Sequence, residues 1–101
     1  MHGEDKMNRL QFLLTKLAEE ASEIAQIALK TQQFGLDESC PGLSETNAER
    51  THKELDDLAA IVELLNEEYK FGYIRSGWNI AEKKAKIEKY YGYSKSLGMV
   101  E

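Results

Sequence analysis

The chain is poor in cysteine and proline and has no long apolar run. These shortages exclude several classes of fold and of metal site. Its 101 residues include one cysteine, Cys40, so it can form no internal disulfide and cannot build a zinc site from cysteine alone. This usage fits a reducing compartment. No segment approaches the roughly 20 apolar residues that span a bilayer, and residues 1–6 are polar, unlike a signal peptide. We therefore expect a cytoplasmic protein that does not enter a membrane.

Basic charge is also in short supply. The chain has 13 lysines and arginines against 18 aspartates and glutamates, a net charge of −5, which argues against a general nucleic-acid binder because phosphate contacts need a basic face. The balance is uneven, since residues 79–95 hold five lysines and two glutamates, or +3, which leaves −8 for the rest. An acidic body with a basic third segment could match a metal ion on one side and phosphate on the other.

Apolar residues recur at helical spacing, and no stretch alternates as a strand would. Spacings of three and four residues predict a first helix over about 5–34, closed by Gly35. The only proline falls in a predicted loop over 36–43. The apolar stripe of this helix comprises Leu10, Leu13, Leu14, Leu17, Ala21, Ile24 and Ala28.

Two further helices are expected. The second begins at position 44 or 46, with Thr46 and Glu49 as a capping box, and stops at Gly72. The third begins with Asn79 as its cap and ends near Tyr91. The second helix is expected to bury Leu55, Leu58, Ile61, Val62, Leu65 and Tyr69.

A first helix of about 30 residues would be ~45 Å long, which is long for a monomer with two other helices to cover it. Its second apolar edge, formed by Phe12, Ile27 and Phe34, then needs a partner. We expect an all-α protein of long antiparallel helices, a four-helix bundle completed by a second subunit in a homodimer or homotetramer. The alternative is that the third helix and the tail cover this edge.

Acidic residues border the apolar faces of the first two helices. At about 100° per residue, Glu20 and Glu23 lie on one side of the first helix, and Glu54 and Asp57 on one side of the second. If the helices pack antiparallel, these four carboxylates converge. Oxygen donors of this kind suit Mg²⁺ or Mn²⁺, which keep several waters and take substrate phosphates. The other interpretation is a set of solvated surface carboxylates.

The string Glu19-Glu20-x-x-Glu23 followed by Glu54-x-x-Asp57 resembles the signature of the MazG-like all-α nucleoside triphosphate pyrophosphohydrolases. That superfamily also contains the dimeric dUTPases and the phosphoribosyl-ATP pyrophosphohydrolases. The similarity covers about the first two-thirds of the chain, together with a lysine-rich third helix.

The resemblance implies that residues 1–101 are one MazG-like hydrolase domain of nucleotide metabolism. It implies a Mg²⁺-dependent enzyme, with Mn²⁺ as a substitute, in which an activated water cleaves a nucleoside triphosphate into the monophosphate and pyrophosphate. Glu19 would orient the site or activate the attacking water, and Glu20 would share in catalysis. The implied metal ligands are Glu20, Glu23, Glu54 and Asp57.

Basic side chains near these carboxylates are candidates for phosphate contacts. Lys16 and Lys30 lie on the side of the first helix that carries Glu23, and Arg50 lies one turn before Glu54. On the third helix, Lys86 and Lys89 are predicted to contact the triphosphate. Each of the five could instead be a solvated surface charge.

Two other classes of protein could also carry acidic side chains on packed helices. One is a non-catalytic helical oligomerisation or adaptor module whose acids are merely exposed. The other is a ferritin-like di-iron protein, since Glu49 and His52 form a Glu-x-x-His string. That string has no second copy and projects away from the apolar face of its helix.

Overall fold

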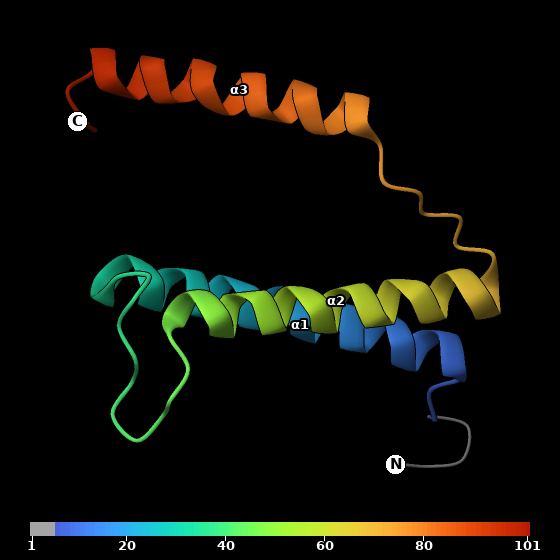
Figure 1. Cartoon of the computed structure of the whole chain (residues 1–101). Coiled ribbons are helices and arrows are strands. Elements are labelled where there is room, and N and C mark those ends of the chain that lie inside the picture. Colours follow the sequence, from blue (N-terminus) through green and yellow to red (C-terminus); the bar gives the residue numbers. More distant parts are fainter. Residues whose placement is uncertain (1–5) are drawn as a thin grey trace.

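The computed structural model describes residues 6–101, which form three helices and no strand. Helices α1 (Arg9–Phe34) and α2 (Asn47–Tyr69) pack as an antiparallel hairpin, whereas α3 (Gly77–Ser96) lies apart from it (Figure 1). The all-α prediction is confirmed for this part of the chain. None of the described helices combines the length and the apolar character that crossing a bilayer requires.

A reciprocal capping box sets the start of α1. The side chain of Asn8 accepts a hydrogen bond from the backbone of Gln11 at 2.8 Å, and the Gln11 side chain accepts one from the Asn8 backbone at 2.9 Å. The predicted start at Asp5 lies outside the described residues, and the helix begins at Arg9. The predicted end is confirmed, because Gly35 adopts a positive φ of 96° and its N–H donates to Thr31.

The predicted capping box at the start of α2 is also present. The backbone N–H of Glu49 donates to the Thr46 hydroxyl at 3.1 Å, and the Thr46 N–H donates to the Glu49 carboxylate at 3.0 Å. The predicted stop at Gly72 is wrong, because α2 ends at Tyr69 and Lys70 takes the left-handed conformation. The Asn66 side chain exchanges two hydrogen bonds with the Tyr73 backbone, at 2.9 and 3.0 Å, which turns the chain away before another helical turn forms.

The core of the hairpin is small. Leu13, Ile27 and Leu65 are its fully buried apolar residues, with exposures of 3%, 4% and 0%. Each contributes about 1.5–3 kcal/mol relative to an exposed side chain. The prediction that Ile27 belongs to an uncovered edge is therefore wrong, because α2 covers it. Conversely, Leu55 was expected to be buried and is 48% exposed.

Buried polar contacts attach the interhelical loop to the start of α2. The Asn47 side chain is buried and donates to the Gly35 carbonyl at 2.9 Å, while its backbone N–H donates to Glu38 at 2.9 Å. At the other end of the hairpin, Arg9 pairs with Glu68 through two hydrogen bonds of 3.0 Å. These contacts hold α1 and α2 in a defined antiparallel register.

Helix α3 differs from its prediction at both ends. Ser76, not Asn79, is the N-cap: its hydroxyl accepts from the Asn79 N–H at 3.1 Å. A serine three residues before Asn79 supplies the same capping oxygen one turn earlier. The helix also continues past Tyr91 to Ser96, because its lysines and tyrosines tolerate helical geometry and one glycine does not stop it. No residue of α3 is buried.

Candidate metal centre

Three of the predicted carboxylates meet between α1 and α2. Glu20 and Glu23 lie one turn apart on α1, and Glu54 lies opposite them on α2. One carboxylate oxygen from each lies within 4.8 Å of the other two. The i, i+3 spacing places the first two on one side of α1, and the antiparallel packing of the hairpin brings the third to them.

Two oxygens of this cluster have no hydrogen-bond partner within the described residues. Glu20 and Glu54 are half-buried, and the Oε2 atom of each is shielded from solvent and unpaired. Glu23 is exposed and forms the open side of the cluster. A shielded carboxylate oxygen without a donor carries a desolvation cost, and a hard cation would remove it.

The close approach of these acids changes their titration. The pKa of Glu54 is raised to about 7, first by the hydrogen bond that its protonated form can make to Glu23, then by loss of hydration and by the negative charges of Glu23 and Glu20. The pKa of Glu20 is also raised, first by loss of hydration and then by the charges of Glu23 and Asp57. In both groups, loss of hydration and the nearby negative charges disfavour the ionised form.

Two acids of the predicted motif lie outside this cluster. Asp57 is exposed, yet its charge contributes to the raised pKa of Glu20, so it lies within electrostatic reach. Glu19 is exposed and forms an ion pair with Lys16 at 3.1 Å. The Lys16 ammonium also lies 5.4 Å from the centre of the Phe12 ring, which places it on the outer surface of α1.

Two of the predicted basic residues lie beside the cluster. Lys30 and Arg50 line a cavity of about 90 Å³ with Glu23 and Glu54. The same two residues line a neighbouring cavity of about 350 Å³. Gln26, which lines the first cavity, was not predicted, although it follows Glu23 by three residues. Glu38 and Cys40, which line the second cavity, were not predicted either.

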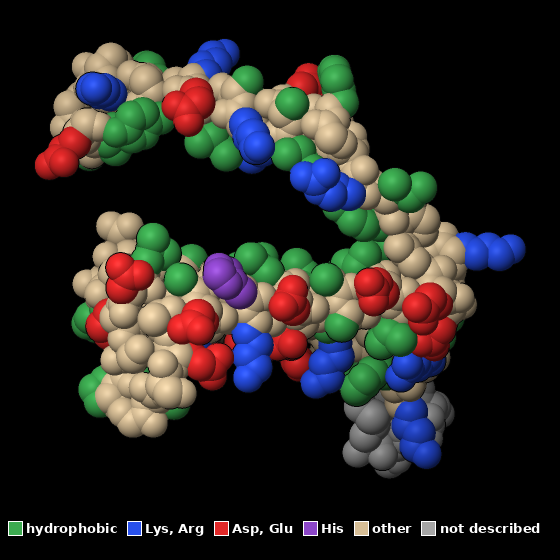
Figure 2. All heavy atoms as spheres, viewed as in Figure 1, with side chains coloured by type: hydrophobic (Ala, Val, Ile, Leu, Met, Phe, Trp, Pro, Cys, Tyr) green, Lys and Arg blue, Asp and Glu red, His purple; other side chains and the backbone are tan. Residues whose placement is uncertain are grey.

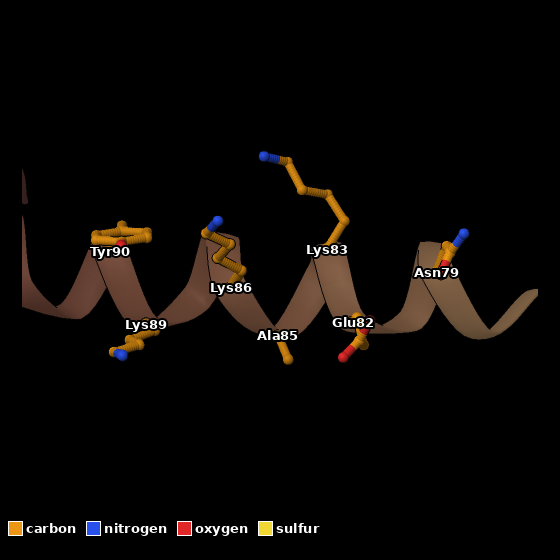
Figure 3. Close-up of a pocket in the computed structure, with 7 residues that line it drawn as sticks. All are labelled: Asn79, Glu82, Lys83, Ala85, Lys86, Lys89 and Tyr90. Atoms are coloured by element: carbon orange, nitrogen blue, oxygen red, sulfur yellow. The ribbon is translucent and has the colours of Figure 1, made fainter.

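The other predicted phosphate contacts lie elsewhere. Lys86 and Lys89 belong to a shallow depression formed by α3 alone, and they leave that helix in different directions (Figure 3). Within residues 6–101, α3 packs on neither α1 nor α2, so one chain does not bring these lysines to the carboxylate cluster. Any such contact would require a rearrangement of α3 or a second chain.

The Glu-x-x-His string takes no part in the cluster. Glu49 is used in the cap of α2, where its hydrogen bonds to Thr46 lower its pKa. His52 is exposed. The candidate ligands are therefore carboxylate oxygens without imidazole, a donor set typical of Mg²⁺ or Mn²⁺ and not of a di-iron centre.

In comparisons with known proteins, no family model, no curated protein and no solved structure matches this chain.

Proposed function

We propose that the chain is a MazG-like nucleoside triphosphate pyrophosphohydrolase that depends on Mg²⁺ and releases the nucleoside monophosphate and pyrophosphate. The observation that carries the proposal is the cluster of Glu20, Glu23 and Glu54, in which three carboxylate oxygens from two helices lie within 4.8 Å of one another. The Oε2 atoms of Glu20 and Glu54 are shielded and unpaired within the described residues. This donor set fits a hard divalent cation.

The ligand set would be Glu20, Glu23 and Glu54, with Asp57 joining it through a change of rotamer or a bridging water. When bound, Mg²⁺ would neutralise negative charge on the phosphate oxygens that it contacts. Glu19 would accept a proton from the attacking water once its ion pair with Lys16 opens.

Lys30 and Arg50 would hold the phosphate chain. They line the cavity beside Glu23 and Glu54 and also the larger neighbouring cavity, so they stand between the metal ligands and a space of about 350 Å³. An anionic substrate could thus contact the cation and both basic side chains together. Lys16, Lys86 and Lys89 would contact substrate only after rearrangement or assembly.

The proposal includes a homodimer or homotetramer with a four-helix bundle completed by a second subunit. Apolar side chains left exposed on the hairpin and on α3 support it, among them Leu55 at 48% and Ile87 at 53%. Burying such surface between copies is the usual way in which a small helical chain completes its core.

The test is a panel of ribo- and deoxyribonucleoside triphosphates with Mg²⁺ or Mn²⁺, scored separately for pyrophosphate and for inorganic phosphate. We expect pyrophosphate release that chelation abolishes and that Glu20→Gln or Glu54→Gln reduces by at least about 10²-fold. Glu67→Gln, an exposed charge on α2 outside the cluster, is the matched control. No turnover on any nucleotide, together with no metal effect on melting, would instead favour a non-catalytic helical oligomerisation module.

A further inference from the structure

The chain is more extended than a compact monomer of its length. Its radius of gyration is 18.0 Å, whereas a compact chain of this length has one of about 13 Å. Its accessible surface is 8289 Å², whereas a folded monomer of 11.5 kDa exposes about 5,800 Å². The excess of roughly 2,500 Å² is larger than the about 800 Å² that each partner buries in an ordinary stable interface.

Helix α3 is the main source of this excess. It has no buried residue and packs on neither helix of the hairpin. Ile80, Ile87 and Tyr91 follow at spacings of seven and four, which places these three side chains on one face, whereas Trp78 and Tyr93 lie on other faces. Ile87 and Tyr91 of this face are 53% and 47% exposed. A helix of this kind is stabilised by packing and not by propensity alone.

The hairpin carries a groove of matching character. It has a volume of about 720 Å³ and lies mainly on α2, and its apolar lining is formed by Leu17, Leu55, Leu58, Ala59 and Val62. Figure 2 shows hydrophobic side chains along the side of the hairpin that faces α3 and along the side of α3 that faces the hairpin, with open space between them. At 1.5 Å per residue, α3 is ~30 Å long and α2 is ~34 Å long, so the two apolar surfaces are similar in length.

The connection between α2 and α3 carries a chain's own α3 away from this groove. Both hydrogen bonds between Asn66 and Tyr73 bind the first half of the connector to α2, and Tyr73 and Arg75 themselves line one end of the groove. The remainder of the connector then leads away from the hairpin (Figure 1).

Charge favours another copy of the same chain as the occupant. Residues 79–95, nearly all of them in α3, carry +3 and the rest of the chain −8. Lys83 and Lys84 flank the apolar face of α3, and Glu63 lines the groove. The α3 of one copy therefore complements the hairpin of another in both apolar character and charge.

We propose that two copies exchange their α3 helices, so that the apolar face of each α3 lies in the groove of the partner's hairpin. The arrangement is isologous, since each copy gives one helix and receives one. The dimer would then hold six helices, three from each copy, and each hairpin would be covered by the partner's α3. The inference rests on the oligomer proposed above and is independent of its chemistry.

The test is a site-directed crosslink in the full chain. In a Cys40→Ser background, Val62→Cys marks the groove and Ile87→Cys marks the apolar face of α3. A short bismaleimide reagent tolerates a shift of one helical turn, about 5.4 Å. We expect light scattering to give twice the 11.5 kDa chain mass, or a multiple of that dimer, and crosslinking to give a covalent dimer on a denaturing gel.

The matched control moves the second cysteine to Lys89, about 200° further round α3, where we expect at least fivefold less covalent dimer. Crosslinks confined within single chains would overturn the exchange. So would a covalent dimer formed by Val62→Cys alone, which would place two hairpins against each other.

A pair of polar substitutions gives a second readout. Ile87→Asn is expected to halve the mass measured by light scattering at low micromolar concentration, whereas Ala85→Asn, on the other side of α3, leaves it unchanged. Replacing alanine by asparagine lowers helix propensity more than replacing isoleucine by asparagine does. If loss of helicity alone changed the mass, the Ala85→Asn control would therefore be affected at least as much. An unchanged mass for Ile87→Asn would count against the exchange.

Discussion

Binding of Mg²⁺ is expected to weaken sharply as the pH falls from 8 to 6, because protons compete for the same carboxylates. The pKa of Glu54 is about 7, so this group is largely ionised at pH 8 and largely protonated at pH 6. A cation binds the ionised form, and the apparent dissociation constant therefore rises by the factor 1 + 10^(pKa − pH), which is about 1.1 at pH 8 and about 11 at pH 6. The structure thus predicts roughly a tenfold loss of affinity across this range.

The assay is calorimetric titration with Mg²⁺, and in parallel with Mn²⁺, at both pH values. Glu20 also has a raised pKa, so its protonation adds to the effect. Glu54→Gln is expected to weaken binding at pH 8 by roughly tenfold or more, because a ligand charge is lost, and to flatten the pH dependence. Glu67→Gln should retain the wild-type profile, since it lies outside the cluster.

Equal affinities at pH 6 and pH 8 would refute the reasoning, because the raised pKa of Glu54 and its role as a ligand could not then both hold. Binding that Glu54→Gln leaves intact would place the cation elsewhere. An absence of binding at both pH values would remove the metal centre itself.

Three further results follow from the packing and titration of the hairpin. Leu65→Ala should lower the free energy of unfolding by about 2–5 kcal/mol in urea titrations, since the side chain is fully buried; a loss below 1 kcal/mol would contradict that burial. Asn47→Ala should cost about 1–3 kcal/mol, because the Gly35 carbonyl loses its donor, and an unchanged midpoint would count against this contact. The metal-free protein should melt at a lower temperature at pH 8 than at pH 5, because the raised pKa values of Glu20 and Glu54 mean that the folded state binds more protons than the unfolded state between about 4.5 and 7. Glu54→Gln should reduce that pH dependence, and a slope of the opposite sign would show that other groups dominate.

Local sequence signals were sufficient to predict much of the secondary structure of the hairpin. The Thr46–Glu49 capping box and the Gly35 stop were predicted correctly because each depends on a few neighbouring residues. The same held for Glu20 and Glu23, whose spacing of three residues is enough to place them on one side of a helix.

Predictions that depend on contacts with distant residues were wrong. Ile27 was expected to be uncovered and is buried, because the crossing of α2 over α1 decides which side of a helix is covered. The end of α2 was predicted too late, because the Asn66 side chain binds the backbone of Tyr73, seven residues away. The cap of α3 was misplaced because Ser76 and Asn79 are both good capping residues, and the chain uses the earlier one.

The sequence by itself determined that the chain is helical, that acidic side chains border the apolar faces of two of its helices, and that its third segment is basic. These properties follow from periodicity, spacing and charge, which do not depend on packing. Only the tertiary structure decided that Glu54 meets Glu20 and Glu23, that Asp57 and Glu19 lie outside that cluster, and that the α3 lysines lie away from it. The physical reason is that spacing orients a side chain around its own helix, whereas the distance between groups on different helices depends on how those helices pack.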